Sequence, residues 1–340
     1  MKRGKSIVNF EEFQTVNPDQ HKELLVDELF TRSRDYRNSQ AFLETINFLS
    51  RFRSQKPYNA YLLHVQNPRV SFVRTASQWA KEFGRVIKPD AKPLLVLFPF
   101  APLHVVYELF DTEGQESPEE MLERVHLRQR SYKTAPEWMT KNIVQNARNH
   151  GILLCARPMS VLHQGTARTM TTVDYLDLEQ GRFLDVIEGN KSAPLFEGQR
   201  LLVENPKRLR YIIELNDRLQ DTITFETLVH ELAHILLGHL GSVEDVSPTD
   251  TWKDRRTSNL KSAEFEAECV AYIVCMRLGL EPASWAYLAY YLETDSEIPN
   301  MSLDMVLTVS GKIETWLEQI VIVKERKGMK LRKTQQKSIT

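Results

Sequence analysis

The sequence is poor in cysteine and has no long apolar segment. Its 340 residues include three cysteines, Cys155, Cys269 and Cys275, an odd number without the spacing of a disulfide framework. This excludes a disulfide-rich secreted scaffold and predicts reduced, packed thiols. No stretch approaches the roughly 18 apolar residues of a membrane span, and the first residues, MKRGKSIVNFEEF, lack the apolar core of a signal peptide. We therefore expect a cytoplasmic protein without a membrane partner.

Net charge is almost absent, but the charges are unevenly placed. The formal net charge is −1 and 42% of the residues are hydrophobic, which allows two domains with real cores and excludes wholesale disorder. Between positions 51 and 92, nine basic residues face two acidic ones, a local balance of +7. The chain then turns acidic around Gly114 and Pro118, which predicts a linker over 111–135. Residues 324–340 are basic without an apolar period, which predicts a flexible tail.

The segment HELAHILLGH at 230–239 carries the strongest chemical signal, because it contains His-Glu-x-x-His in a run that favours a helix. His230 and His234 are about 40° apart around an α-helix, so both rings can close on one metal ion. Glu231 then lies beside the metal, where its carboxylate can accept a proton from water and pass it to a leaving amine. The motif predicts a Zn²⁺ site with Glu231 as the catalytic base. A buried helix with incidental histidines is the alternative.

A second helix with two carboxylates on its buried face is predicted over 261–276, KSAEFEAECVAYIVCM. Buried carboxylates need a cation or hydrogen-bond donors, and the histidine-bearing helix can supply both. Glu264 is therefore expected to be the third metal ligand, with the fourth position open to water. Glu268, one turn further on, is expected to accept the free ring N–H of a ligating histidine. Glu266 points about 160° away from Glu268 and is expected to be solvated.

His239 is the rival third ligand. Metzincins place glycine seven and histidine ten residues after the first histidine. Here Gly238 and His239 follow His230 by eight and nine residues. On a continuous helix His239 lies about 180° from His230, so it reaches the same ion only if the helix breaks at Gly238. We expect His239 to be structural or to support a ligand from behind.

At these residues the chain resembles a known family. FETLVHELAHILLGH, followed by a helix with E-x-x-A-E, is similar to the metallopeptidase domain of the ImmA/IrrE family and of the related ArdC-type antirestriction proteins. The resemblance implies a gluzincin-like site in which His230, His234 and Glu264 bind zinc and Glu231 is the general base. Glu268 stands where the family usually has asparagine. The segment 285–323 also resembles the closing helices of ArdC-type proteins.

The first 110 residues are predicted to form an α+β domain. Periodicity and composition predict helices over 18–54 and 75–83 and strands over 68–74, 93–100 and 103–110. This order resembles the N-terminal single-stranded-DNA-binding domain of ArdC-type proteins. Such binding needs cations that track phosphates and aromatics that stack on bases. The residues predicted for it are Tyr61, Arg85, Lys88 and Lys92. Core positions for the aromatics and a solvated face for the charges are the alternatives.

The second domain is predicted over 136–323 and is expected to be zincin-like. YIIELN at 211–216 alternates like a strand at a sheet edge, to which an extended peptide can add through main-chain hydrogen bonds. The sequence thus predicts a two-domain α+β protein with a gluzincin-type zinc metalloendopeptidase. The resemblance implies a protein substrate such as a transcriptional repressor, another DNA-binding regulator or a mobile-DNA-associated factor. The alternative is an antirestriction or single-stranded-DNA-binding protein with a structural or vestigial metal site.

Overall fold

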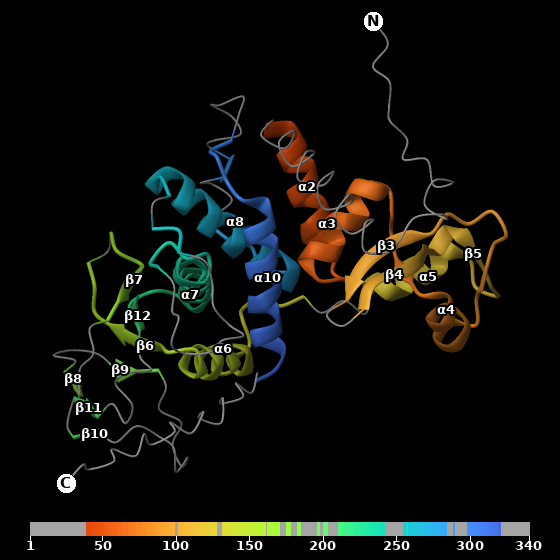
Figure 1. Ribbon diagram of the computed structural model, residues 1–340. Coiled ribbons are helices and arrows are strands. Elements are labelled where there is room, and N and C mark those ends of the chain that lie inside the picture. Colours follow the sequence, from red (N-terminus) through yellow and green to blue (C-terminus); the bar gives the residue numbers. More distant parts are fainter. Residues whose placement is uncertain are drawn as a thin grey trace, which may run out of the picture.

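The computed structural model is a helical body with several small sheets (Figure 1). It describes residues 39–98, 101–127, 131–160, 162–170, 175–177, 182–184, 196–197, 200–202, 210–241, 254–256, 258–283, 288–289 and 298–320. The part of the predicted helix over 18–54 that precedes residue 39, and the tail over 324–340, lie outside these ranges. The mixture of helices and sheets confirms the α+β class. Within the described ranges, every helix is too short or too polar to traverse a bilayer.

A four-stranded sheet supports the helices of the C-terminal half. The sheet order is β7 (Gly165–Thr169), β12 (Tyr211–Asn216), β6 (Ile152–Arg157) and β9 (Arg182–Phe183). The helices are α6 (Glu137–Asn149), α7 (Asp221–Leu236), α8 (Leu260–Leu278) and α10 (Leu303–Glu318). A smaller sheet has the order β10 (Phe196–Glu197), β11 (Arg200–Leu202) and β8 (Tyr175–Asp177). Because α7 packs on β7 and β12, the histidine motif lies against the sheet.

The strand β12 is interior, so the prediction of a sheet edge at YIIELN is wrong. It runs parallel to β6 and antiparallel to β7, and all six of its residues are buried. Its alternating pattern comes from Glu214, whose buried carboxylate pairs with Arg157 of β6 at 3.2 Å and Arg168 of β7 at 3.4 Å. A buried carboxylate that pairs with two half-exposed arginines therefore gives this interior strand the alternation of a half-exposed one. In the described part of this sheet the edge next to α7 is β7.

The N-terminal half contributes to two cores. Its elements are α2 (Ser39–Arg51), α3 (Pro57–Gln66), β1 (Val73–Arg74), α4 (Ala76–Phe83), β2 (Val86–Ile87), β3 (Leu94–Phe98), β4 (Ala101–Glu108), the 3-10 turn η3 (Leu109–Asp111), β5 (Thr112–Glu113) and α5 (Pro118–Leu127). α2 packs on α8 and α3 packs on α10, which places Phe42 and Leu63 in one core with Trp316. A smaller core contains Trp79 and Met121. The predicted boundary near residue 110 does not separate these two cores.

Much of the predicted linker at 111–135 is folded, which contradicts that prediction. β5 pairs with β2, and α5 follows directly. Ser117 and Glu120 form a reciprocal capping box before α5, whose first residue is Pro118. Met121 then packs into the smaller core. The proline and the acidic residues mark the start of a helix, because carboxylates stabilise the positive end of the helix dipole.

Two amide side chains cover the outer edge of β3, the last strand in the sheet order β1, β4, β3. Asn59 donates to the carbonyl of Leu97 and accepts its N–H, both at 2.9 Å. Gln66 makes the same pair of bonds with Leu95 at 2.8 Å. The two amides are two turns apart on one face of α3. They satisfy the backbone groups that an added strand would otherwise bind.

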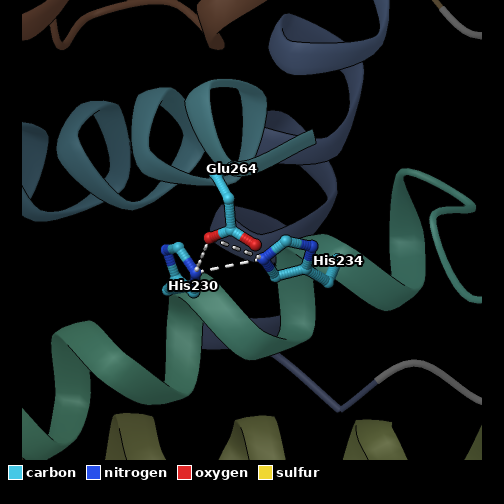
Figure 2. Close-up of side chains that lie close together, drawn as sticks. All are labelled: His230, His234 and Glu264. Atoms are coloured by element: carbon cyan, nitrogen blue, oxygen red, sulfur yellow. Dashed lines mark hydrogen bonds and ion pairs between the residues drawn. The ribbon is translucent and has the colours of Figure 1, made fainter. Parts of the chain in front are cut away.

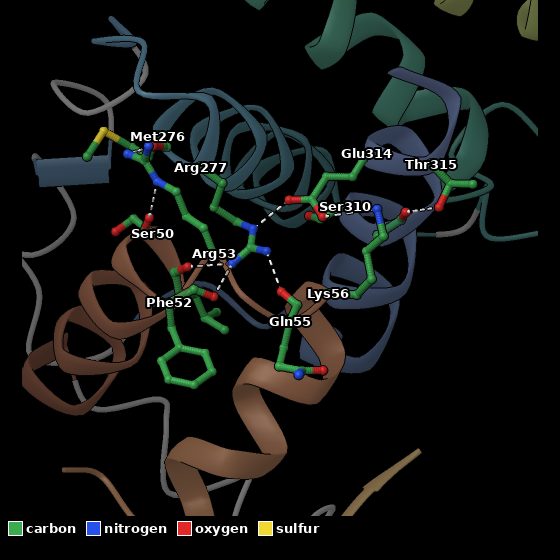
Figure 3. A network of polar contacts seen from close by, with 12 residues as sticks. Ser50, Phe52, Arg53, Gln55, Lys56, Met276, Arg277, Ser310, Glu314 and Thr315 are labelled. Carbon is green, nitrogen blue, oxygen red and sulfur yellow. Dashed lines mark hydrogen bonds and ion pairs between the residues drawn. The ribbon is translucent and has the colours of Figure 1, made fainter. Parts of the chain in front are cut away.

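A buried arginine joins the N-terminal helices to α8 and α10 (Figure 3). Arg277 of α8 donates to the carbonyls of Leu49 and Phe52, at 2.8 Å each, and pairs with Glu314 of α10. The last carbonyls of a helix have no partner within it, so Arg277 completes the end of α2. Arg53 reciprocates by donating to a carbonyl near the end of α8 at 2.8 Å. The two halves of the chain therefore share one interior.

Candidate metal centre

Three side chains from two helices point toward one another (Figure 2). His230 and His234 come from adjacent turns of α7, and their Nε2 atoms are 3.1 Å apart. The Glu264 carboxylate of α8 lies 3.5 Å from Nε2 of His230 and 3.6 Å from Nε2 of His234. The three ligand atoms lie within 4.8 Å of one another, so this group could hold a metal ion. The Glu264 side chain is 40% exposed, which leaves one side of the group open to water.

The electrostatics of this group favour a cation. Burial lowers the pKa of His230, but hydrogen bonds to Glu264 and Glu268 outweigh it and raise this pKa to about 10. Hydrogen bonds from His230 and His234 hold the pKa of Glu264 far below its usual value. The lone pairs of the histidine nitrogens and of the Glu264 carboxylate that share a proton here are also the ones that bind a metal. Metal binding is therefore coupled to proton release.

Glu268 lies behind His230. Its Oε1 atom is 3.6 Å from Nδ1 of His230, on the far side of the ring from the Nε2 atom that faces the group. A carboxylate in this place favours the tautomer with hydrogen on Nδ1, which leaves the Nε2 lone pair for a metal. Glu268 thus lies where the sequence predicts it.

Glu231 lies between the metal group and the strand β7. Its carboxylate accepts the backbone N–H of Ala167, a contact that the sequence did not reveal. Burial raises the pKa of Glu231, while the charges of His230 and His234 oppose this rise. A buried carboxylate with a raised pKa beside metal ligands is suited to accept and return a proton.

The N–H of Ala167 belongs to the outer side of β7. Met170 donates to Arg210, and the carbonyl of Gln164 accepts a hydrogen bond from the other end of β12. In an antiparallel pair the bonding residues alternate, so the backbone groups of Gly165, Ala167 and Thr169 point away from β12. Among the residues that the structure describes, no strand pairs with this side of β7, and the edge runs beside Glu231.

The helix that carries the motif ends in a turn that brings His239 back to it. Gly238 has a φ of 80°, and the N–H groups of His239 and Gly238 donate to the carbonyls of His234 and Ile235 at 3.0 Å each. This is the Schellman end of a helix. It places Nδ1 of His239 at 3.0 Å from Nδ1 of His234. The helix does break at Gly238, but His239 supports a ligand from behind, and the glycine was the signal for this turn.

Glu266 is buried, so the prediction of a solvated side chain is wrong. Its side chain is 1% exposed and accepts hydrogen bonds from His239 at 2.9 Å and Ser302 N–H at 2.6 Å. Arg255 donates to both carboxylate oxygens at 2.7 Å. The helix α8 is enclosed by α7, α10 and α2, so it has little solvated face over this stretch. The apolar residues on all sides of the helix were the available signal.

The residues predicted for nucleic-acid binding are only partly exposed. Tyr61 is 5% exposed and packs in the large core, so its ring cannot stack on a base. Arg85 is 2% exposed and donates to Thr112, so it cannot meet a phosphate. The predictions for these two residues are wrong. Lys88 donates to a backbone carbonyl at 2.9 Å, and Lys92 is exposed.

Comparison with known proteins identifies no relative of this chain. The sequence matches no family model, and neither a curated protein nor a solved structure is significantly similar to it. The chemistry of the site is therefore inferred from His230, Glu231, His234 and Glu264 themselves.

Proposed function

We propose that the protein is a zinc-dependent metalloendopeptidase with a zincin-like C-terminal domain and a gluzincin-type site. The supporting observation is the convergence of His230, His234 and Glu264, with Glu231 beside them and next to β7, the edge strand of the described sheet. Two imidazole nitrogens and one carboxylate oxygen form a ligand set of catalytic zinc sites, which keep a fourth position for water. The resemblance of HELAHILLGH to ImmA/IrrE peptidases favours the same activity.

In this proposal each residue has a defined task. A bound zinc ion would polarise a water molecule and the carbonyl of the scissile peptide bond. Glu231 accepts a proton from the water and delivers it to the leaving amine. The N–H of Ala167 holds the Glu231 carboxylate in place, because a carboxylate accepts and a backbone N–H donates. Glu268 orients the ring of His230.

The substrate in this proposal is a protein segment in extended conformation. The outward backbone groups of β7 can pair with such a segment, which would pass directly beside Glu231. Main-chain pairing recognises a peptide without requiring one side-chain sequence. The family resemblance favours a transcriptional repressor, another DNA-binding regulator or a mobile-DNA-associated factor as the protein cleaved.

The alternative is an antirestriction or single-stranded-DNA-binding protein with a structural metal site. A structural site needs ligands but no base, so it gives no task to Glu231. The burial of Tyr61 and Arg85 also removes two of the four residues proposed to contact DNA. The two proposals differ in the task they give to Glu231, so Glu231 is the residue to test.

The deciding experiment replaces Glu231 by Gln in the full chain. We expect Glu231→Gln to retain one zinc per chain, measured by elemental analysis, because the three ligands are unchanged. Cleavage of a denatured-protein and peptide panel should fall about 10²- to 10⁴-fold, because the proton acceptor is lost. The matched control is Glu226→Gln, the same change on a buried residue of α7 that accepts the N–H of Ala283. Equal cleavage by wild type and Glu231→Gln, or no zinc in the wild type, would contradict the proposal.

A further inference from the structure

Behind His234 lies a chain of buried polar side chains that leads away from the metal group. Nδ1 of His234 is 3.0 Å from Nδ1 of His239, and Nε2 of His239 is 2.9 Å from Glu266. The side chains of His239 and Glu266 are 5% and 1% exposed. Water therefore has little access to this chain, and each polar atom depends on its protein neighbours.

The position of each proton follows from Glu266, the side chain of this row that lies farthest from the metal group. Arg255 donates to both oxygens of Glu266, and the backbone N–H of Ser302 donates to one of them. A carboxylate held in this way is ionised and can only accept, so Nε2 of His239 carries hydrogen. The other ring nitrogen of a neutral His239 then has a lone pair and accepts.

The metal end of the chain requires the same arrangement. Nε2 of His234 faces Glu264 and His230, so it needs its lone pair for a metal. Its proton therefore belongs on Nδ1, which is the atom that faces the accepting Nδ1 of His239. The reverse arrangement would put an N–H of His234 into the metal group. The contacts of Glu266 and those of the metal group thus select the same tautomers of His234 and His239.

We propose that His239 and Glu266 are positioning residues that fix His234 as an Nε2 ligand. This inference rests on the proposed function only through its metal site. The turn at Gly238 makes the contact possible, and Arg255 secures it by donating its own N–H to the carbonyl of Gly238 at 2.9 Å. The two ligands are therefore supported differently, His230 directly by a carboxylate and His234 through an intervening imidazole.

The test measures metal binding by the full chain, with Zn²⁺ in competition with a chromophoric chelator and with Co²⁺ as a spectroscopic probe. His239→Leu should weaken Zn²⁺ binding about 10- to 100-fold and change the visible absorption of bound Co²⁺, because His234 loses its orientation. His239→Gln should restore both toward wild type, since an amide can accept from His234 and donate to Glu266. The control is His150→Leu, which removes a buried histidine packed on Trp316 and should leave both readouts unchanged.

A second measurement uses the wild-type protein and needs no variant to fold. Nitrogen NMR of the zinc-loaded rings should show hydrogen on Nδ1 of His234 and on Nε2 of His239. Hydrogen on Nδ1 of His239, or unchanged Zn²⁺ affinity and Co²⁺ spectrum in folded His239→Leu, would overturn the inference. If the wild type binds zinc but gives one of these results, the proposed function stands and only the positioning role of His239 and Glu266 is rejected. If the wild type binds no zinc, both fail.

Discussion

The edge strands β3 and β7 differ in what their outer backbone groups contact. The outer backbone groups of β3 are bonded to the side chains of Asn59 and Gln66. Those of β7 point away from β12, and the N–H of Ala167 meets Glu231. Unpaired edges invite association with other chains, so an edge without a chemical task is better covered. Within the described part of the chain, side chains thus cover the backbone edge far from the candidate metal group, whereas no described strand pairs with the edge beside it.

Among the changes that test this comparison of edges, the largest effect is expected from breaking the contact between β7 and Glu231. Ala167→Pro removes the N–H that Glu231 accepts but spares the ladder with β12, because this N–H points outward. A hydrogen bond to a charged group contributes about 1.5–3 kcal/mol, so kcat/KM for peptide hydrolysis should fall about 10- to 100-fold. Zinc content should stay at the wild-type value. Steady-state kinetics and elemental analysis provide the two measurements.

The matched control for this change is Thr169→Pro, which removes another outward N–H of β7 without touching Glu231. It should cost less activity than Ala167→Pro. Equal losses would assign the whole effect to substrate pairing along β7. Wild-type kinetics in Ala167→Pro would show that the contact has no role in hydrolysis.

A smaller effect is expected from uncovering β3. The double substitution Asn59→Ala and Gln66→Ala removes four hydrogen bonds to β3, each contributing roughly 0.5–1.5 kcal/mol. The free energy of unfolding should fall by about 2–6 kcal/mol, and the exposed edge should promote self-association. Urea denaturation and analytical ultracentrifugation measure these changes. Gln40→Ala, which removes an exposed amide bonded to Glu44, is the control. A double variant that stays monomeric and stable would refute the covering role.

The smallest effect concerns how α3, which carries both amides, is held on α10. Burial and the neighbouring Asp304 of α10 raise the pKa of Tyr58 on α3 to about 12. Its pKa in the unfolded chain is about 10. The folded state therefore binds the proton more tightly, and stability is lost as pH rises from about 10 toward 12. Tyr58→Phe should flatten this loss in urea denaturation at several alkaline pH values. An unchanged pH dependence would exclude Tyr58 as its source.

Local spacing predicted the centre of the site, and distant packing decided the rest. His230, His234 and Glu264 follow helical periodicity, which is a property of neighbouring residues, and the structure brings them together. The burial of Glu266 depends on helices that enclose α8 from three directions, and its partners Arg255 and Ser302 lie 11 and 36 residues away. A count of residues around one helix contains no information about these neighbours.

Strand order and domain boundaries could also not be predicted from local sequence patterns. The alternation in 211–216 was real, but Glu214 is matched by arginines on two other strands, so the strand is interior. Basic residues between 51 and 92 suggested a charged face, whereas Arg85 is committed to a buried bond with Thr112. Polar side chains that satisfy buried partners and polar side chains that meet water look identical in a sequence.

The contacts of Arg277 also determine when the end of α2 can be completed during protein synthesis. The carbonyls of Leu49 and Phe52 are synthesised 228 and 225 residues before the arginine that binds them. At roughly 5–20 residues per second, a ribosome needs about 10–45 s to cover that distance. Glu314 follows 37 residues later still. The end of α2 therefore remains without this partner while the intervening residues are translated, and α8, which supplies Glu264, is synthesised together with that partner.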